Sequence, residues 1–195
     1  MHSAILAGGG ATRFGGLPKG LELVGGRRIL DRLVDACTEA FGEPPLLVAN
    51  AADALSWRPD LRVVVDTMPG LGALGGIYTA VRQAPAPVIC VAWDMPFVTP
   101  ALLEALAEGL GHFDAFLPES GGRRGMEPLC AGYGPACRPA IERSLAEGDR
   151  RAIAFHPHVR VGILREPAVR AIGNPDVLFF NVNTEDDLRA AEELT

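Results

Sequence analysis

Lysine is almost absent from this sequence. Of its 18 basic residues only Lys19 is a lysine, and all the others are arginines. An ammonium group is a compact, strongly hydrated point charge, whereas a guanidinium is a planar fork, so the two are not interchangeable. The lone lysine is therefore expected where a point charge is needed, the alternative being chance survival.

Long apolar runs and closely spaced cysteines are also lacking. No uninterrupted apolar segment approaches the roughly 18 residues that a bilayer span requires, and residues 1–7 do not resemble a signal peptide. No Cys-x-x-Cys pair occurs among the cysteines, which disfavours zinc, iron–sulfur and disulfide frameworks. We therefore predict a cytoplasmic protein with reduced core thiols and no membrane partner.

Positive charge and aromatic side chains are both scarce. The net charge is −6 and aromatic residues make up 6% of the chain, which argues against a broad nucleic-acid-binding surface. A single bound nucleotide remains compatible with this composition. With 195 residues, 48% of them hydrophobic, the chain is expected to form one domain, residues 1–195, that folds alone.

Apolar strands alternate with amphipathic helices along the chain. Strands are expected at residues 3–7, 46–49, 61–65, 88–92, 113–117, 128–133, 158–164 and 177–182. Helices are expected at residues 29–42, 51–57, 73–83, 99–110, 139–146 and 184–193. This alternation predicts an α/β fold with a doubly wound, mostly parallel, Rossmann-like sheet, in which residues 119–175 hold an antiparallel excursion.

A glycine-rich loop, residues 8–20, follows the first expected strand, where an open sheet places its ligand crevice. It is not a Walker A loop, because no Ser or Thr follows Lys19, and Arg13 replaces the third glycine of a dinucleotide loop. Its glycines let backbone N–H groups approach a phosphate chain, whose charge Arg13 and Lys19 offset. The alternative is a surface loop with solvated charges.

Two aspartates each follow an expected buried strand. Asp66 and Asp94 should therefore meet at the carboxyl edge of the sheet, beside the glycine loop. Magnesium usually takes one or two protein carboxylates together with substrate phosphates, so Asp94 is the predicted metal ligand. The alternative for each aspartate is a turn residue or a helix cap.

Two further groups of polar residues are candidates for binding a second substrate. Asn181 and Asn183 are two residues apart, so on a strand they would share one face; strand-end turn chemistry is the alternative. Arg123 lies in a glycine-rich loop and could meet a phosphate, a solvated loop being the other interpretation.

Several segments together resemble one known family, and they extend over the whole chain. They are Leu6-Ala7-Gly8-Gly9, Arg13-Phe14-Gly15-Gly16, Lys19-Gly20-Leu21, Asn50, Asp66, Gly72-Ala73-Leu74-Gly75-Gly76-Ile77, Trp93-Asp94-Met95-Pro96-Phe97, Glu127-Pro128-Leu129-Cys130-Ala131 and Asn181-Val182-Asn183-Thr184. Their order and spacing resemble the molybdenum cofactor guanylyltransferases. Pro18 departs from an acidic residue expected before the lysine, and Trp93 departs from the usual cysteine.

The resemblance implies transfer of GMP from GTP to the terminal phosphate of molybdopterin, with Mg²⁺ as cofactor and release of pyrophosphate. It implies that the catalytic residues are Arg13, Lys19 and Asp94, with Asp94 as metal ligand. It implies GTP binding by Leu6, Ala7, Gly8, Gly9, Lys19, Asn50, Asp66 and Asp94, and acceptor binding by Asn181, Asn183 and Arg123. Transient contact with molybdoenzymes or their chaperones would follow.

Two alternatives stay open. A cytidylyltransferase or sugar-phosphate nucleotidyltransferase would use the same fold, and Pro18 gives this interpretation some weight. A non-catalytic nucleotide-binding or cofactor-carrier protein would keep the fold without turnover, although Arg13, Lys19 and Asp94 together disfavour it.

Overall fold

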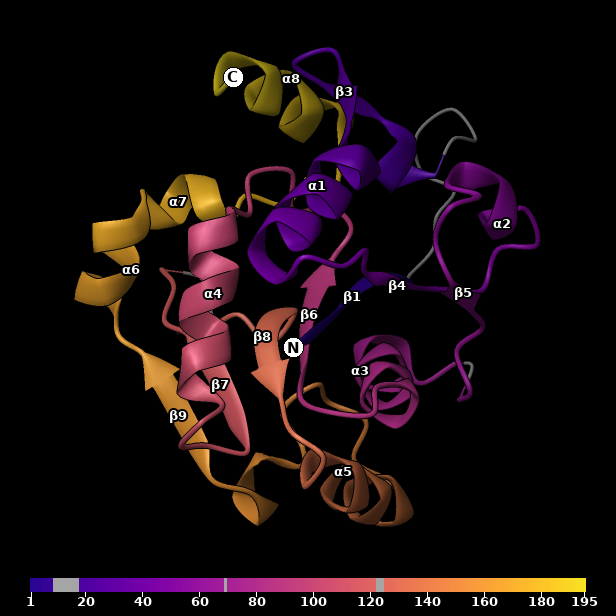
Figure 1. Cartoon of the computed structure of the whole chain (residues 1–195), viewed down its shortest axis with the longest axis vertical. Helices are drawn as coiled ribbons and strands as arrows, with labels where there is room; N and C mark the ends of the chain where they lie inside the picture. Colours follow the sequence, from indigo (N-terminus) through magenta and orange to yellow (C-terminus); the bar gives the residue numbers. More distant parts are fainter. Residues whose placement is uncertain (9–17, 69, 122–124) are drawn as a thin grey trace.

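A seven-stranded sheet forms the centre of the protein (Figure 1). The computed structural model describes residues 1–8, 18–68, 70–121 and 125–195. The order of the strands across the sheet is β5-β4-β1-β6-β8-β7-β9, and β2 and β3 form a separate antiparallel ribbon.

The strands and helices have the following bounds. The strands are β1 (His2–Ala7), β2 (Leu23–Val24), β3 (Arg27–Arg28), β4 (Leu46–Ala49), β5 (Val63–Val64), β6 (Val88–Ala92), β7 (Ala115–Pro118), β8 (Cys130–Tyr133) and β9 (Val161–Leu164). The α-helices are α1 (Ile29–Phe41), α2 (Ala54–Trp57), α3 (Gly72–Gln83), α4 (Pro100–Gly109), α5 (Cys137–Ala146), α6 (Glu166–Ile172), α7 (Pro175–Leu178) and α8 (Glu185–Glu193). Short 3₁₀ helices are η1 (Lys19–Leu21) and η2 (His156–His158).

Four adjacent strands of the sheet, β5, β4, β1 and β6, run parallel. In register, Ala7 at the end of β1 lies beside Ala49 of β4, and Leu6 lies beside Ala92 of β6. β8 is antiparallel to both β6 and β7. The doubly wound, mostly parallel fold and the antiparallel excursion are thus confirmed, and the carboxyl ends of the parallel strands share one edge.

The sheet is covered on both faces, and alternate residues of β1 enter opposite cores. Ile5 packs with α1 and α4 in one core, whereas Leu6 packs with α3 and α5 in the other; Figure 1 shows these helix pairs on opposite sides of the sheet. This is the layering that a parallel sheet with crossover helices requires. None of the described helices combines the length and apolarity needed to cross a bilayer.

The cysteines belong to these cores and make no disulfide. Cys37, Cys90, Cys130 and Cys137 are all buried and free. Burial raises the pKa of Cys37 to about 12, so this side chain is a neutral thiol at physiological pH. The predicted core location of the cysteines is confirmed.

Local sequence signals fix several helix ends. Gly42 ends α1 with a φ of 72°, a left-handed conformation that glycine adopts without strain. The hydroxyl of Thr99 accepts a hydrogen bond from the backbone N–H of Leu102 ahead of Pro100. Thr184 and Asp187 form the predicted capping box at the start of α8.

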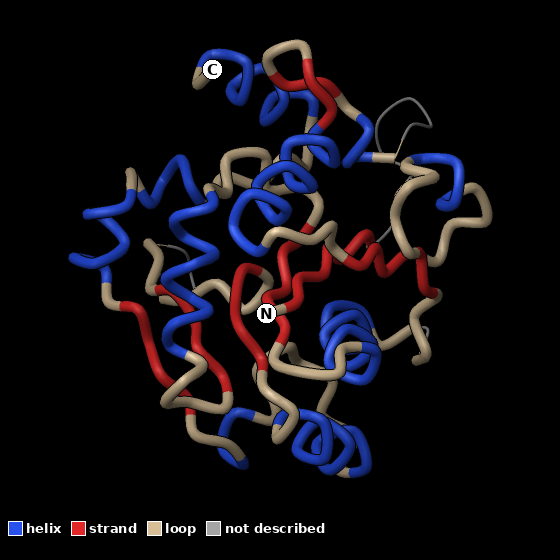
Figure 2. The backbone as a smooth tube through the Cα atoms, viewed as in Figure 1, coloured by secondary structure: helices blue, strands red, loops and turns tan. Residues whose placement is uncertain are grey.

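The strand expected at residues 177–182 was wrong. Asn174 accepts a hydrogen bond from the backbone N–H of Asp176, and Pro175 opens the short helix α7. A loop then runs to Thr184 (Figure 2). The run Val177-Leu178-Phe179-Phe180 is rich in residues that strands favour, but the cap and proline before it set a helix start.

Candidate functional site

A pocket of about 240 Å³ lies at the carboxyl ends of β1, β4 and β6. Its lining brings together seven of the residues predicted from the sequence: Leu6, Ala7, Gly8, Asn50, Asp66, Asp94 and Asn181. The edge of an open α/β sheet is where such folds bind ligands. The strand-end argument therefore placed Asp66 and Asp94 correctly, at one pocket.

Asp66 organises the wall of this pocket beside α3. Its Oδ1 accepts hydrogen bonds from the backbone N–H of Met68 at 2.9 Å and from the hydroxyl of Thr79 at 2.9 Å. The backbone N–H of Asp66 in turn donates to Oδ1 of Asn50, at 2.9 Å. Asp66, which is only 8% exposed, therefore both stabilises a turn and lines the pocket.

Asp94 is a half-buried carboxylate of a different kind. Its Oδ1 is buried and has no hydrogen-bond partner among the residues that the structure describes. Burial raises the pKa of this carboxyl group above its ordinary value, and the Lys19 ammonium partly opposes that effect. A buried, unsatisfied carboxylate oxygen is costly unless something binds it, which marks Asp94 as a binding group rather than a cap.

Lys19 lies close to polar side chains from two distant parts of the chain. Its Nζ lies 4.0 Å from Oδ2 of Asp94 and donates a 2.6 Å hydrogen bond to Oδ1 of Asn183. Asn183 is held by α8, because its backbone N–H donates to the carboxylate of Asp187 at 2.9 Å. The lysine therefore connects the end of the glycine-rich loop to the C-terminal part of the chain.

Asn181 and Asn183 reach the site from a loop, not from the strand that was expected. The side-chain N–H of Asn181 donates to the backbone oxygen of Phe179, at 2.8 Å, and Asn181 lines the pocket. Between the two asparagines, the backbone N–H of Val182 donates to the carbonyl of Asp94, at 2.8 Å. That bond docks the loop against the end of β6, so both side chains are near the site without sharing a strand face.

Three predicted residues, Gly9, Arg13 and Arg123, lie outside the described residues. In the sequence, Gly9 and Arg13 fall within the glycine-rich segment, and Arg123 falls between β7 and β8. Their assignment to the site stays a prediction.

Part of the pocket wall comes from residues that were not individually predicted as site residues, although most of them belong to motifs that carry the family resemblance. It comprises Val48, Gly72, Ala73, Gly76, Ala92, Trp93 and Leu129. The first turns of α3 supply three of these residues. The sequence signal for them was a helix that begins with glycines after a strand-end aspartate. Nothing in the sequence alone indicated the contacts of Trp93.

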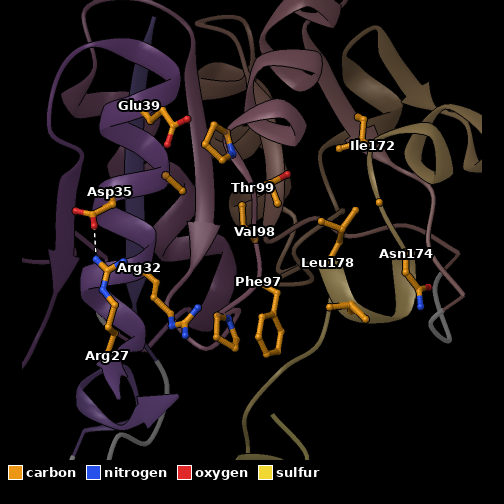
Figure 3. Close-up of a pocket in the computed structure, with 15 residues that line it drawn as sticks. Arg27, Arg32, Asp35, Glu39, Phe97, Val98, Thr99, Ile172, Asn174 and Leu178 are labelled. Carbon is orange, nitrogen blue, oxygen red and sulfur yellow. Dashed lines mark hydrogen bonds and ion pairs between the residues drawn. The ribbon is translucent and has the colours of Figure 1, made fainter. Parts of the chain in front are cut away.

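A second hollow, of about 530 Å³, lies between α1, the start of α4 and the α6–α7 turn (Figure 3). The ion pair between Arg27 and Asp35 crosses one side of it, and Phe97, Val98 and Leu178 are among its apolar lining residues. None of the predicted site residues that the structure describes lines this hollow. The pocket at the strand ends is therefore the better candidate.

The donor set at the strand ends fits magnesium. Within residues 1–8, 18–68, 70–121 and 125–195, no cluster of three or more His, Cys, Asp or Glu side chains is arranged to hold a metal by itself. Magnesium does not need such a cage, because it commonly binds one or two carboxylates and completes its coordination with water and phosphate oxygens. The unsatisfied Oδ1 of Asp94 matches that requirement, whereas Oδ1 of Asp66 already accepts two hydrogen bonds.

Comparisons with known proteins agree on one family. Residues 3–161 match the family model described as MobA-like NTP transferase domain. A probable molybdenum cofactor guanylyltransferase from Pelotomaculum thermopropionicum is 37% identical over 94% of this chain and 88% of its own length. A molybdenum cofactor guanylyltransferase from Desulfosudis oleivorans is 33% identical over 96% of this chain and 92% of its own.

A solved structure agrees with these relatives. The molybdopterin-guanine dinucleotide biosynthesis protein A from Archaeoglobus fulgidus superposes with a TM-score of 0.81 at 30% identity, covering 100% of this chain and 98% of its own. The matched family model spans both strand-end aspartates and Lys19. The chain therefore belongs to the MobA-like NTP transferase domain family.

Proposed function

We propose that this protein transfers GMP from GTP to the terminal phosphate of molybdopterin and releases pyrophosphate. The observation that carries the proposal is the pocket in which Asn50, Asp66, Asp94 and Asn181 meet at the strand ends, in a chain of this family. It is supported by relatives named molybdenum cofactor guanylyltransferases and by a solved structure named for molybdopterin-guanine dinucleotide biosynthesis, which match nearly the whole chain.

In the proposed reaction a terminal phosphate oxygen of molybdopterin attacks the α-phosphorus of GTP. A new P–O bond forms, the bond from the α-phosphorus to the oxygen bridging the β-phosphate breaks, and pyrophosphate leaves. The acceptor oxygen is already ionised near neutral pH, so no protein nucleophile or general base is assigned. Catalysis then depends on positioning and on stabilising charge.

Lys19 and Asp94 carry the main roles. The ammonium of Lys19, close to both Asp94 and Asn183, would neutralise the triphosphate and the charge that develops on it. Asp94 would hold Mg²⁺ through its unsatisfied Oδ1; when bound, that ion supplies Lewis-acid stabilisation of phosphate oxygens. Arg13 is proposed as a second cation on the phosphates.

The remaining predicted residues are proposed to bind the two substrates. Leu6, Ala7, Gly8, Gly9, Asn50 and Asp66 are proposed to bind GTP, and Asn181, Asn183 and Arg123 to bind the acceptor. Guanine has N–H groups that can donate hydrogen bonds to carboxylate and carbonyl oxygens on the pocket wall. Cytosine does not present donors in the same positions. The single-domain organisation, the cytoplasmic location and contact with molybdoenzymes or their chaperones stay predictions.

Pyrophosphate release tests the proposal most directly. The protein is incubated with Mg²⁺ and each of GTP, CTP, ATP and UTP, with and without molybdopterin, and the product is identified by mass spectrometry. We expect release with GTP only, and only in the presence of molybdopterin. Calorimetric titration of GTP and CTP into the same preparation measures base preference without turnover.

Each alternative function gives a distinct result in this assay. Release with CTP, or with a sugar phosphate as acceptor, would establish the corresponding nucleotidyltransferase instead. Tight GTP binding without pyrophosphate release under any combination would identify a non-catalytic nucleotide-binding protein.

A further inference from the structure

Trp93 presses against the glycine that follows the lone lysine. A methyl group at position 20 would lie 2.4 Å from Cε3 and 3.0 Å from Cδ2 of the Trp93 indole. Carbon atoms do not approach so closely, so any side chain at position 20 would displace either the loop or the ring. The six-membered ring of Trp93 and the backbone of Gly20 are therefore in direct contact.

The indole of Trp93 is held from its other side as well. It stacks on Trp57 with ring centroids 5.2 Å apart and an interplanar angle of 22°. Trp57 is itself buried, and its Nε1–H donates a 3.0 Å hydrogen bond to Asp53. Trp93 is 2% exposed, and buried aromatic stacks of this kind resist displacement. The ring is a fixed surface against which Gly20 rests.

Trp93 therefore links the two proposed catalytic groups: it is the chain neighbour of one, and its side chain touches the chain neighbour of the other. Trp93 immediately precedes Asp94, and Gly20 immediately follows Lys19. The backbone N–H of Trp93 donates to the carbonyl of Leu6, at 3.3 Å, which ties the backbone of Trp93 to the end of β1. On the other side of the contact, Lys19 lies in the 3₁₀ helix η1, whose backbone hydrogen bonds are local to residues 18–22.

We propose that Trp93 is a positioning residue, whose indole sets the distance between the Lys19 ammonium and the Asp94 carboxylate by fixing Gly20. The proposal deepens the proposed function and rests on it for its kinetic consequence. A phosphate-binding cation misplaced by about 1 Å costs a large factor in rate. The geometric part, that Trp93 places Lys19, stands on the contacts alone.

The lone lysine allows the geometry to be tested without turnover. Acetic anhydride at a fixed pH modifies the Lys19 amine, and mass spectrometry of the peptide containing it gives the rate. In the wild type the Lys19 side chain is 15% exposed and its amine is hydrogen-bonded to Asn183, so labelling is expected to be slow. We expect Gly20→Ala to speed labelling several-fold and Gly20→Ala combined with Trp93→Leu to restore slow labelling, because leucine leaves room for the added methyl.

Two controls separate positioning from general loss of stability. Gly109→Ala introduces a comparable clash, 2.1 Å from Cδ1 of Phe116, at the far end of α4 from the site. Trp57→Leu removes the other indole of the stack. Both substitutions are expected to lower Tm. Lys19 labelling and turnover are then measured at a temperature 20 °C below the Tm of Gly109→Ala, where this variant is expected to match the wild type.

Kinetics then measure the consequence. With GTP and molybdopterin, Gly20→Ala is expected to lower kcat by about 10- to 100-fold while the Kd for GTP changes less, and the double variant is expected to recover most of the rate. A wild-type protein that releases no pyrophosphate would contradict the proposed function. The labelling series would still test whether Trp93 positions Lys19. The positioning role is overturned if Gly20→Ala labels like wild type, or if the double variant labels no more slowly than Gly20→Ala.

Discussion

The ammonium of Lys19 donates a 2.6 Å hydrogen bond to the side-chain oxygen of Asn183, a residue 164 positions further along the chain. The same ammonium lies 4.0 Å from Asp94. The capping box of α8 fixes Asn183 through Asp187. The Lys19 ammonium thus lies between the proposed GTP and acceptor sides of the site, close to Asp94 on one side and bonded to Asn183 on the other.

Replacing Lys19 should therefore affect chemistry more than folding. Lys19→Ala removes the cation from the triphosphate and is expected to slow GMP transfer by on the order of 100-fold or more, as loss of a preorganised charge contact does elsewhere. Lys19→Arg keeps the charge but replaces the compact ammonium with a planar fork, so an intermediate rate is expected. Steady-state pyrophosphate release and Tm, measured on the same preparations, provide the check. A folded Lys19→Ala variant with the wild-type rate would make the lysine an ordinary loop residue.

Strand ends and helix caps were predictable from the sequence because each depends on a few adjacent residues. The apolar run of β6 followed by Asp94, and the Thr184 and Asp187 capping box, are signals of this local kind. The meeting of Lys19 with Asn183 was not predictable, because it depends on how α8 docks far along the chain. The contact of Gly20 with Trp93 likewise exists only once η1 lies over the end of β6.

The segment at residues 177–182 shows where local reasoning failed. Its β-branched and aromatic residues favour a strand, but Asn174 and Pro175 start a helix and the following loop bonds to Asp94. The two asparagines were assigned to the correct region for the wrong structural reason. Their position depends on the Val182 hydrogen bond to the end of β6 rather than on strand alternation.

Asp66 is expected to matter for stability. Asp66→Ala leaves the N–H of Met68 and the fully buried hydroxyl of Thr79 without their acceptor. The free energy of unfolding should fall by about 2–3 kcal/mol, which lowers Tm by about 5–10 °C in a chain of this size. Asp66→Asn retains an acceptor oxygen and should lose less. Thermal and urea unfolding measure both; an Asp66→Ala protein as stable as wild type would show that these bonds contribute little.

His156 should make stability depend on pH. Burial lowers its pKa from 6.5 to about 4, and its Nε2 has no hydrogen-bond partner among the described residues. Between pH 6.5 and 4 the unfolded chain binds a proton that the folded protein does not, so the free energy of unfolding decreases as pH falls through this range. Allowing for the partly exposed ring, the loss is about 1–2 kcal/mol.

The contribution of His156 is isolated by comparing two variants. His156→Leu cannot take up that proton, so its free energy of unfolding should decline less than that of wild type between pH 6.5 and 4. His158→Leu changes an exposed neighbour in η2 and should retain the wild-type slope. Urea unfolding at half-unit pH steps gives all three curves, and parallel curves for wild type and His156→Leu would exclude this histidine as the cause.

Unlike Asp66, Asp94 is expected to matter little for stability, while its charge is expected to be essential for activity. Asp94→Asn preserves the shape of the side chain but removes the charge that is proposed to hold Mg²⁺. Because burial raises the pKa of Asp94, its ionised form is unfavourable in the folded protein, and removing that charge should leave Tm unchanged or slightly higher. Nearly all GMP transfer should disappear. Calorimetry should also show GTP binding that no longer strengthens when Mg²⁺ is added. A variant that melts much earlier than wild type, yet retains Mg²⁺-dependent transfer at low temperature, would instead make Asp94 a structural residue and move the metal to another ligand.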